Sequence, residues 1–259
     1  MKIAILLSGR IKSYDNFLNI LRKKEKNIDV FISVNDIYSD FYKKVIEDFG
    51  DYLKGFYCKE YNVPLNFKNI WYDKIDDYFN PNLTQFGKNS AAYRTLSCFY
   101  NDTCCFKMAT NYADYHNFEY NIYLRFRSDI IVDDFPYFDI SKVNQNILFS
   151  VIPFCKFTMP ITDNPNGEYK YYDEWKGDRY HYYGDTKHNG KYVTGDIAYG
   201  NRNTMSLYCC CYDYILKKNI ENNGNYFICF ECSLTTFLED SEITWEFFEY
   251  DYKYVVNRF

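Results

Sequence analysis

The first part of the chain alternates between short apolar runs and segments whose apolar residues recur at helical spacing. Residues 1–7 (MKIAILL) form an apolar run with β-branched members, which is typical of a strand buried on both faces. Residues 11–24 carry apolar side chains every three or four positions and predict a helix. Residues 27–34 predict a second strand, residues 40–49 a second helix, and residues 55–60 a short third strand. This alternation predicts an α/β fold.

The middle of the chain is less regular before the pattern returns. Residues 61–87 contain prolines and several Asp and Asn, which predict an irregular loop with one helix near residues 70–79. Residues 90–115 lack Pro and Gly and are apolar at many spacings, so we expect a long, largely buried helix. Residues 120–126 predict a strand, and residues 149–152 a further short strand.

The last part of the chain opens with residues 154–190, which are rich in Gly, Pro, Tyr, Asp and His and show little periodicity. A loop of this length without structure of its own is usually functional. The remaining predictions are a strand or turn at 193–199, a helix at 203–218 capped by Asn203 or Thr204, a short helix at 230–239 and a final edge strand at 243–250. No internal repeat or linker interrupts the pattern, so we expect one domain over residues 1–259.

Composition and charge narrow the class of protein. Aromatic residues make up 22% of the chain, and we interpret most of its tyrosines as half-buried packing side chains with a solvated hydroxyl. A net charge of −5 argues against a nucleic-acid partner, because such proteins usually present a basic face. No run approaches the ~20 apolar residues of a membrane-spanning helix, and no secretory signal opens the chain. We therefore expect a cytoplasmic protein.

The ten cysteines do not form a recognisable framework. They include adjacent runs at residues 104–105 and 209–211, and no C-x-x-C occurs. This is neither the spacing of a zinc site nor that of a disulfide scaffold. We expect reduced thiols that mostly fill helix faces.

The first candidate site follows the first strand, because ligands of an open parallel sheet bind at the carboxyl ends of its strands. Gly9 permits close approach of a ligand to the backbone, and a helix N-terminus just beyond favours phosphate. Ser8 and Arg10 flank it, and Arg10 offers a forked donor. The alternative is a simple turn with a solvent-facing Arg10. The chain has neither G-x-G-x-x-G nor G-x-x-x-x-G-K-[ST], which excludes the usual dinucleotide fingerprint and a P-loop.

The second candidate site closes the strand at residues 120–126. Alternation places Arg125, Arg127 and Asp129 on one face. A charged triplet at the end of a buried strand is costly unless something pairs with it. A diphosphate and a divalent cation would do so, with Asp129 as an oxygen ligand for Mg²⁺ or Mn²⁺ and the arginines directed to phosphate. The alternative is an internal Arg–Asp salt bridge.

Two further carboxylates lie in the second half. Asp196 sits between Gly195 and a small apolar stretch, where it would act as a general base or hold the hydroxyls of an acceptor sugar. A turn Asp that caps the local backbone is the alternative. Glu231 opens the helix predicted at 230–239, where the helix dipole by itself favours a carboxylate.

These residues carry a resemblance to a known family. The chain resembles the small GT-A-like glycosyltransferases of giant DNA viruses and bacterial polysaccharide clusters. The matching segments, in order, are KIAILLSGRIKSY at residues 2–14, DVFIS at 29–33, FYN at 99–101, YNIYLRFRSD at 120–129, GDIAYGN at 195–201 with Met205 and Tyr208 beyond it, and Glu231 with Leu234. Phe230 stands where the family's last element has a proline.

The resemblance implies a Rossmann-like GT-A domain with a mostly parallel central sheet flanked by helices. Its nucleotide-binding half would be residues 1–135 and its acceptor-side half residues 136–259. By the same resemblance, Ser8, Gly9 and Arg10 would line the nucleotide pocket together with Asn35 and Asp36.

The resemblance also implies chemistry. The enzyme would move a hexosyl or deoxyhexosyl group from a UDP- or GDP-linked sugar to a glycan or protein acceptor, with Mn²⁺ or Mg²⁺ as cofactor. Asp129 would be the last acid of a D-x-D-like metal site, although Arg127 occupies the position of its first acid. Arg127 would then itself neutralise the leaving diphosphate. Asp196 or Glu231 would be the acceptor-side base if the reaction inverts. A viral enzyme of this kind would act in the host cytoplasm, the virus factory or the virion.

Two other functions are compatible with the sequence. The incomplete D-x-D also fits a nucleotide-sugar-binding protein that has lost catalysis. The abundance of tyrosine also fits a structural or host-interaction protein that uses a tyrosine-rich surface.

Overall fold

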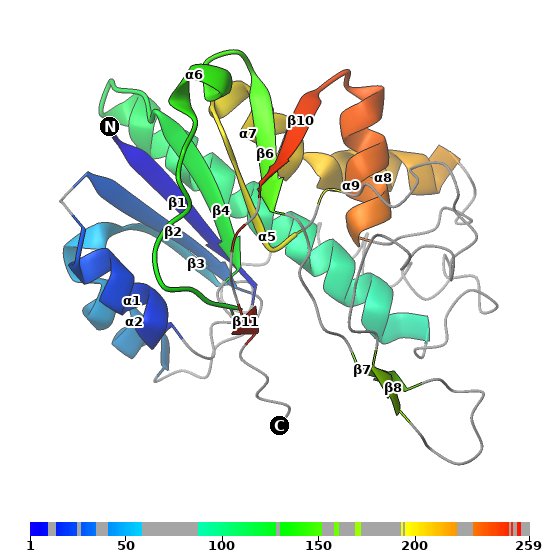
Figure 1. The fold of residues 1–259 in the computed structure, drawn as a ribbon, viewed down its shortest axis with the longest axis horizontal. Helices are drawn as coiled ribbons and strands as arrows, with labels where there is room; N and C mark the ends of the chain where they lie inside the picture. The colour runs from blue at the N-terminus through cyan, green and yellow to red at the C-terminus, as the bar shows by residue number, and fades with distance from the viewer. Residues whose placement is uncertain are drawn as a thin grey trace.

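The protein, seen in a computed structural model, is built on one large sheet (Figure 1). The structure describes residues 1–9, 14–24, 27–34, 41–58, 88–127, 130–151, 158–160, 169–171, 193, 195–221, 230–248, 250 and 253–254.

Seven strands form the sheet in the order β10-β6-β9-β4-β1-β2-β3. Their bounds are β1 (Ile3–Ser8), β2 (Ile28–Val34), β3 (Leu53–Cys58), β4 (Ile122–Arg127), β6 (Ile147–Val151), β9 (Ile197–Gly200) and β10 (Thr244–Phe248). β9 runs antiparallel to its neighbours β4 and β6, and the other neighbouring pairs are parallel. The mostly parallel α/β sheet that the sequence predicts is therefore confirmed, as is the edge position of the last predicted strand.

The apolar run at the start of the chain becomes the centre of the sheet. All six residues of β1 are buried, as expected for a strand covered on both faces. Ile5 and its alternate neighbours pack toward helix α1 (Asp15–Arg22), whereas Leu6 faces the long helix α5 (Lys88–Tyr115) on the opposite side. The two faces of β1 thus contribute side chains to the two hydrophobic clusters of the core.

Helices flank the sheet on both faces (Figure 1). Their bounds are α1 (Asp15–Arg22), α2 (Phe41–Phe49), α5 (Lys88–Tyr115), α6 (Ile140–Val143), α7 (Arg202–Cys209), α8 (Cys211–Glu221) and α9 (Phe230–Asp240), with a 3₁₀ turn η1 at Gly50–Tyr52. α5 crosses β1, β2 and β3 and also contacts α7, α8 and α9. It therefore packs against elements from both the first and the second half of the chain. The long buried helix predicted from residues 90–115 is confirmed.

One helix prediction is wrong in its form. Residues 203–218 make two helices, because the chain leaves helical geometry at Cys210, and the N-cap is Asn201. The Asn201 side chain accepts a hydrogen bond from the Thr204 N–H at 3.0 Å. The helix is therefore capped by the residue that follows β9, two positions before the predicted Asn203. The run Cys209 to Cys211 has weak helix propensity, which favours the break.

Two short ribbons complete the fold. β7 (Thr158–Pro160) pairs with β8 (Tyr169–Tyr171), so the segment predicted to be a loop without structure contains strands. β5 (Ile130–Ile131) pairs with β11 (Lys253–Tyr254) near the end of the chain. The helix predicted near residues 70–79 lies outside the described residues.

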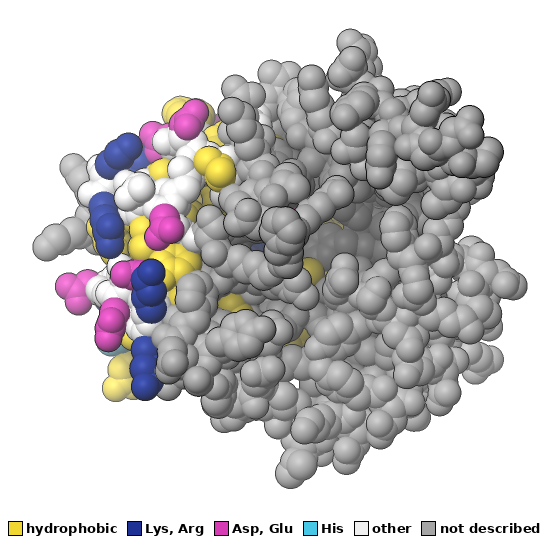
Figure 2. All heavy atoms as spheres, turned by 90° about the horizontal axis from the view of Figure 1, so that it is seen from below, with side chains coloured by type: hydrophobic (Ala, Val, Ile, Leu, Met, Phe, Trp, Pro, Cys, Tyr) yellow, Lys and Arg dark blue, Asp and Glu magenta, His cyan; other side chains and the backbone are white. Residues whose placement is uncertain are grey.

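The described surface is mixed in charge. Exposed Lys43 and Lys44 on α2 stand one turn from exposed Glu47, and Asp15 opens α1 while Arg22 closes it. Figure 2 views the molecule from below and shows basic and acidic side chains interspersed on the described part of that face. None of the helices in the described ranges has the length and apolarity that a membrane crossing requires.

Six cysteines of α5 and of the chain from α7 to α8 are free thiols: Cys98, Cys104, Cys105, Cys209, Cys210 and Cys211. Cys105, Cys209 and Cys211 are buried, and burial raises their thiol pKa well above the usual value. These side chains serve as small apolar packing groups.

The end of α9 contains a strained residue that gives a stability prediction. Glu242 has φ 56°, and Ile243 N–H and Glu242 N–H bond back to Leu238 and Glu239 carbonyls at 3.1 and 3.0 Å, which is a Schellman motif. Glu242→Gly should stabilise the protein by about 0.5–1 kcal/mol in urea unfolding, because glycine takes this conformation without a Cβ clash. Glu47→Gly, within α2, is the control and should lower stability by about the same amount. Destabilisation by both would contradict the assignment.

Candidate functional site

The candidate site lies at the row of carboxyl ends of the parallel strands, which forms one edge of the sheet across the strand direction. Ser8, the last residue of β1, stands opposite Arg127, the last residue of β4. β9 is antiparallel, so its first residue, Ile197, pairs with Phe126 at the same edge. The topology therefore brings Asp196 beside Arg127, although 69 positions separate them in the sequence.

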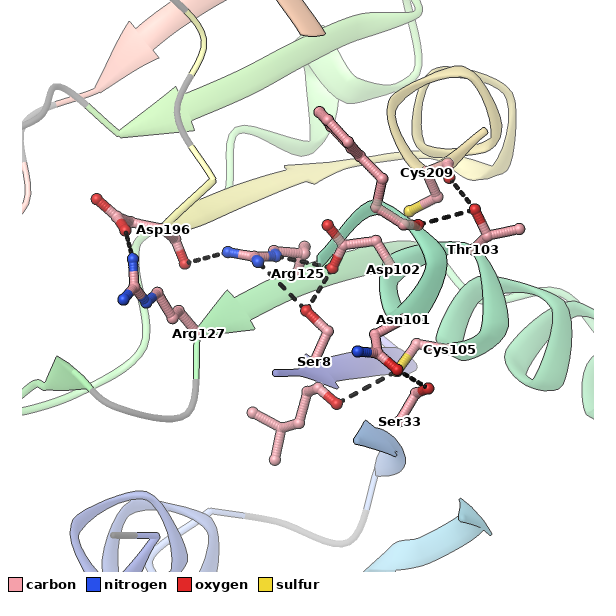
Figure 3. A network of polar contacts seen from close by, with 12 residues as sticks. Ser8, Ser33, Asn101, Asp102, Thr103, Cys105, Arg125, Arg127, Asp196 and Cys209 are labelled. Carbon is pink, nitrogen blue, oxygen red and sulfur yellow. Dashed lines mark hydrogen bonds and ion pairs between the residues drawn. The ribbon is translucent and has the colours of Figure 1, made fainter. Parts of the chain in front are cut away.

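A buried polar network underlies this edge (Figure 3). Asp102, on α5, accepts a hydrogen bond from the Ser8 hydroxyl and forms an ion pair with Arg125, whose Nε lies 3.1 Å from Asp102 Oδ1. A second guanidinium nitrogen of Arg125 donates to Ser8 Oγ at 3.2 Å. The three side chains come from β1, α5 and β4, so this network ties the central strands to the helix that covers them.

Arg125 lies inside the protein. Its side chain is 3% exposed, and its third guanidinium nitrogen donates to the Asp196 carbonyl at 3.2 Å. Burial acts to lower the pKa of this guanidinium, but the charge and hydrogen bond of Asp102, together with Tyr208 and Cys98, outweigh it and raise the pKa, so Arg125 stays charged. The internal ion pair that the sequence allowed as an alternative is present for Arg125, with Asp102 as its acid. Arg125 supports the site from within the fold.

Arg127 and Asp196 form the more accessible layer. Arg127 Nη1 lies 3.3 Å from Asp196 Oδ1, and the Arg127 N–H donates to the Asp196 carbonyl at 2.9 Å. The Arg127 side chain is 43% exposed, whereas that of Asp196 is 8% exposed. Both arginines of β4 thus hold Asp196, one through its carboxylate and one through its backbone. The result is a carboxylate of fixed position beside a partly solvated cation.

α5 adds two buried polar residues that the sequence analysis did not propose as site residues. Asn101 accepts a hydrogen bond from Ser33 Oγ at 2.8 Å, which adds the end of β2 to the network. Asn101 and Asp102 are both fully buried within a helix that otherwise packs against apolar strands. Two adjacent polar residues in the predicted buried helix were the available signal, because a buried polar side chain requires a partner.

Asp102 has unused acceptor capacity. Its Oδ1 accepts from both Ser8 and Arg125, whereas its Oδ2 is buried and has no hydrogen-bond partner among the residues that the structure describes. A buried carboxylate oxygen without a partner is costly. The network is therefore strongly dependent on the single Asp102–Arg125 pair.

The other predicted site residues divide into two groups. Gly9 has φ 102°, a conformation that favours glycine, and its N–H donates to the Ser33 carbonyl at 3.2 Å. Glu231 is the second residue of α9, so it lies in the first turn as predicted. Arg10, Asn35, Asp36 and Asp129 lie outside the described residues. The structure thus brings together Ser8, Gly9, Arg125, Arg127 and Asp196 at one edge.

The described residues do not make a metal site by themselves. Within the described ranges, no three His, Cys, Asp or Glu side chains are placed to hold a metal ion. The two carboxylates of the network, Asp102 and Asp196, are both paired with arginines. Asp129 lies outside the described residues, and its role as a metal ligand stays a prediction.

Comparison with known proteins finds only distant likenesses. No protein-family model and no curated protein sequence matches the chain. The mannosyltransferase Ktr4p from S. cerevisiae is 13% identical, with a TM-score of 0.46 over 97% of this chain and 70% of that chain.

Two further solved structures are similar at the same level. Core-mannan synthase A from Aspergillus fumigatus, in a Mn/GDP form, is 12% identical, with a TM-score of 0.45 over 98% of this chain and 75% of that chain. The 4-diphosphocytidyl-2C-methyl-D-erythritolsynthase from Anaerococcus prevotii is 9% identical, with a TM-score of 0.43 over 96% of this chain and 87% of that chain. At these identities and TM-scores, the likenesses transfer neither an activity nor a residue's role to this chain.

The buried ion pair gives a prediction about stability. Asp102→Asn leaves the Arg125 charge uncompensated inside the protein and should destabilise it by about 3–5 kcal/mol in urea unfolding. The double variant Asp102→Leu with Arg125→Met removes both charges, and it should lose clearly less than the single variant. Equal losses would show that the charge pairing itself is unimportant.

Proposed function

We propose that the protein is a glycosyltransferase that moves a sugar from a nucleoside-diphosphate sugar to a hydroxyl of a glycan or protein acceptor. One observation carries this proposal. Three sequence segments of the resemblance, residues 2–14, 120–129 and 195–201, contribute Ser8, Arg127 and Asp196 to one sheet edge. Ligands of open α/β sheets bind at such an edge.

Arg127 supplies the charge that a leaving diphosphate needs. When the anomeric C–O bond breaks, negative charge builds on the nucleoside diphosphate, and a positioned cation stabilises it. Arg127 is partly solvated, ends its strand at the edge and carries a guanidinium suited to phosphate oxygens. Gly9 leaves its side of the edge open, since a Cβ placed there would meet no atom within 4 Å.

Asp196 is the proposed acceptor-side base. The acceptor oxygen attacks the anomeric carbon, the bond from that carbon to the diphosphate oxygen breaks, and the hydroxyl proton passes to the Asp196 carboxylate. Three bonds from β4 fix the backbone and side chain of Asp196. Glu231 is the second candidate for this role in an inverting reaction.

We propose the remaining details from the resemblance. The donor is UDP- or GDP-linked and carries a hexosyl or deoxyhexosyl group. Mn²⁺ or Mg²⁺, held by Asp129, would add positive charge at the diphosphate oxygens when bound. Arg10, Asn35 and Asp36 would line the nucleotide pocket.

The deciding experiment is donor binding and turnover. Purified protein is mixed with UDP-, GDP- and dTDP-sugars, with and without Mn²⁺, and nucleotide release and thermal shift are followed. Nucleotide release with at least one donor is the expected result. Binding without release across the panel would favour the inactive nucleotide-sugar-binding alternative. No thermal shift with any nucleotide would contradict the proposal and favour a structural or host-interaction role.

Arg127→Gln tests the diphosphate contact. The variant should bind the nucleoside diphosphate about tenfold or more weakly by calorimetry, because a hydrogen bond to a charged group contributes about 1.5–3 kcal/mol. Arg202→Gln is the matched control: Arg202 pairs with Asp114 and Glu119 beyond the other end of β9 and should leave affinity unchanged. Equal affinities for the two variants would remove Arg127 from the site.

Asp196→Asn tests the base. The variant keeps the shape of the side chain but removes the proton acceptor, so the transfer rate should fall by about 10²–10⁴-fold while nucleotide affinity stays within about threefold. Initial rates at saturating donor and calorimetry with the nucleotide alone separate the two effects. Full activity in Asp196→Asn would shift the role to Glu231, whose substitution with Gln is the companion measurement.

A further inference from the structure

Arg125 connects β4 to three other parts of the fold through the three nitrogens of its guanidinium (Figure 3). Nε donates to Asp102 Oδ1 on α5 at 3.1 Å, and Nη2 donates to Ser8 Oγ at the end of β1 at 3.2 Å. Nη1 donates to the Asp196 carbonyl, just before β9, at 3.2 Å. Because the guanidinium is planar and rigid, the contacts with Asp102 and Ser8 fix the direction in which Nη1 points.

The Asp196 carbonyl lies where the pairing of β4 with β9 ends. The last pair of this ladder is Phe126 with Ile197, so Asp196 is the first residue beyond it. Its carbonyl accepts two hydrogen bonds, from the Arg127 N–H at 2.9 Å and from Arg125 Nη1 at 3.2 Å. Together they fix the orientation of this peptide unit, and with it the position from which the Asp196 side chain leaves the backbone.

The contact with Asp196 is separable from the charge pairing with Asp102. Ala198 stands opposite Arg125 in the register of β4 and β9 and is fully buried on the side of the sheet that faces α5. Opposite residues of an antiparallel pair share one face, so this small side chain leaves space beside the guanidinium. A lysine would also neutralise Asp102, but its single ammonium cannot hold Asp102, Ser8 and Asp196 in one plane.

We propose that Arg125 is a positioning residue for Asp196, so that the rate of sugar transfer depends on it and nucleotide affinity does not, an inference that rests on the proposed function. The Arg125 side chain is 3% exposed, so it acts on the reaction through Asp196 and not by touching substrate. A base must stand within hydrogen-bond reach of the acceptor hydroxyl, and a displacement of about 1 Å can cost about a hundredfold in rate. Asp102 and Ser8 orient the guanidinium, and Arg125 transmits that orientation to the carboxylate.

Arg125→Lys is the test variant, because lysine keeps the charge beside Asp102 and loses the donor to the Asp196 carbonyl. Thr103→Val is the matched control: Thr103 is also buried on α5, but its hydroxyl donates to the Cys209 carbonyl at the end of α7. Nucleotide release is measured with the saturating donor that the wild-type protein turns over among the UDP-, GDP- and dTDP-sugars. Calorimetry is performed with UDP and GDP.

The expected result separates rate from affinity. In Arg125→Lys, nucleotide release should fall by about a hundredfold, whereas affinity for UDP or GDP should stay within about threefold of the wild type. Thr103→Val should keep both quantities within about threefold. Hydrogen exchange of the Arg127 amide, which donates to the same Asp196 carbonyl, should accelerate by about tenfold in Arg125→Lys and stay unchanged in Thr103→Val.

A double-variant cycle distinguishes positioning from a general loosening of the fold. If Arg125 acts through Asp196, Arg125→Lys should cost less than about threefold once Asp196→Asn has removed the carboxylate. A loss that came from the whole fold would be equal in the two backgrounds. Asp102→Leu with Arg125→Met leaves neither charge of the buried pair and should show the same loss of release. This variant decides the question if Arg125→Lys does not fold.

Three results would overturn the inference: unchanged nucleotide release in Arg125→Lys, an equal loss in Thr103→Val, or equal losses in the two backgrounds of the cycle. The proposed function fails separately if the wild-type protein releases no nucleotide from any donor. In that case, unchanged exchange of the Arg127 amide in Arg125→Lys would still overturn the positioning role, and faster exchange would support it.

Discussion

The ion pair between Asp102 and Arg125 is the constraint on which the rest of the site depends. It joins α5 to β4 inside the core, and through the Ser8 hydroxyl it includes β1 as well. Two charges withdrawn from water are tolerated only with close mutual contact and additional hydrogen bonds. This requirement fixes the height of α5 above the sheet. It also fixes the Asp196 backbone, since Arg125 donates to its carbonyl.

The fold could be predicted from the sequence where one periodicity dominates. β1 and β2 are uniformly buried. Their short apolar runs, each followed by a predicted turn, indicate strands that are covered on both faces. α5 was predictable for the same reason, because 28 residues without Gly or Pro favour one long helix. The break between α7 and α8 was not predictable from spacing, since it falls at Cys210, where neither Gly nor Pro ends the helical pattern. The β5–β11 ribbon was hidden too, because two-residue strands leave no periodic pattern.

The site was predictable in its location and less so in its internal contacts. Alternation along residues 120–129 correctly placed Arg125 and Arg127 on one face, but it does not distinguish a buried position from one at the edge of the sheet. Arg125 lies two residues inside the end of β4 and is buried against Asp102 of α5, whereas Arg127 is the last residue of the strand and is partly solvated. The polar residues Asn101 and Asp102 in a buried helix indicate that Asp102 needs a partner, but identifying Arg125 as that partner needs the tertiary arrangement. The same holds for the contact between Arg127 and Asp196.

The reversed direction of β9 has a consequence for how such a chain can vary. Ser8 and Arg127 are the last residues of β1 and β4, whereas Asp196 directly precedes the first residue of β9. The connection that precedes β9 can therefore gain or lose residues without shifting the register of β1, β2 and β4, because loop-closure cost grows slowly with length. Insertions before residue 195 would reshape the surroundings of Asp196 and leave Ser8 and Arg127 in place. A single sheet thus separates the groups of the candidate site that the parallel strands fix from the group whose surroundings the connection before β9 can change.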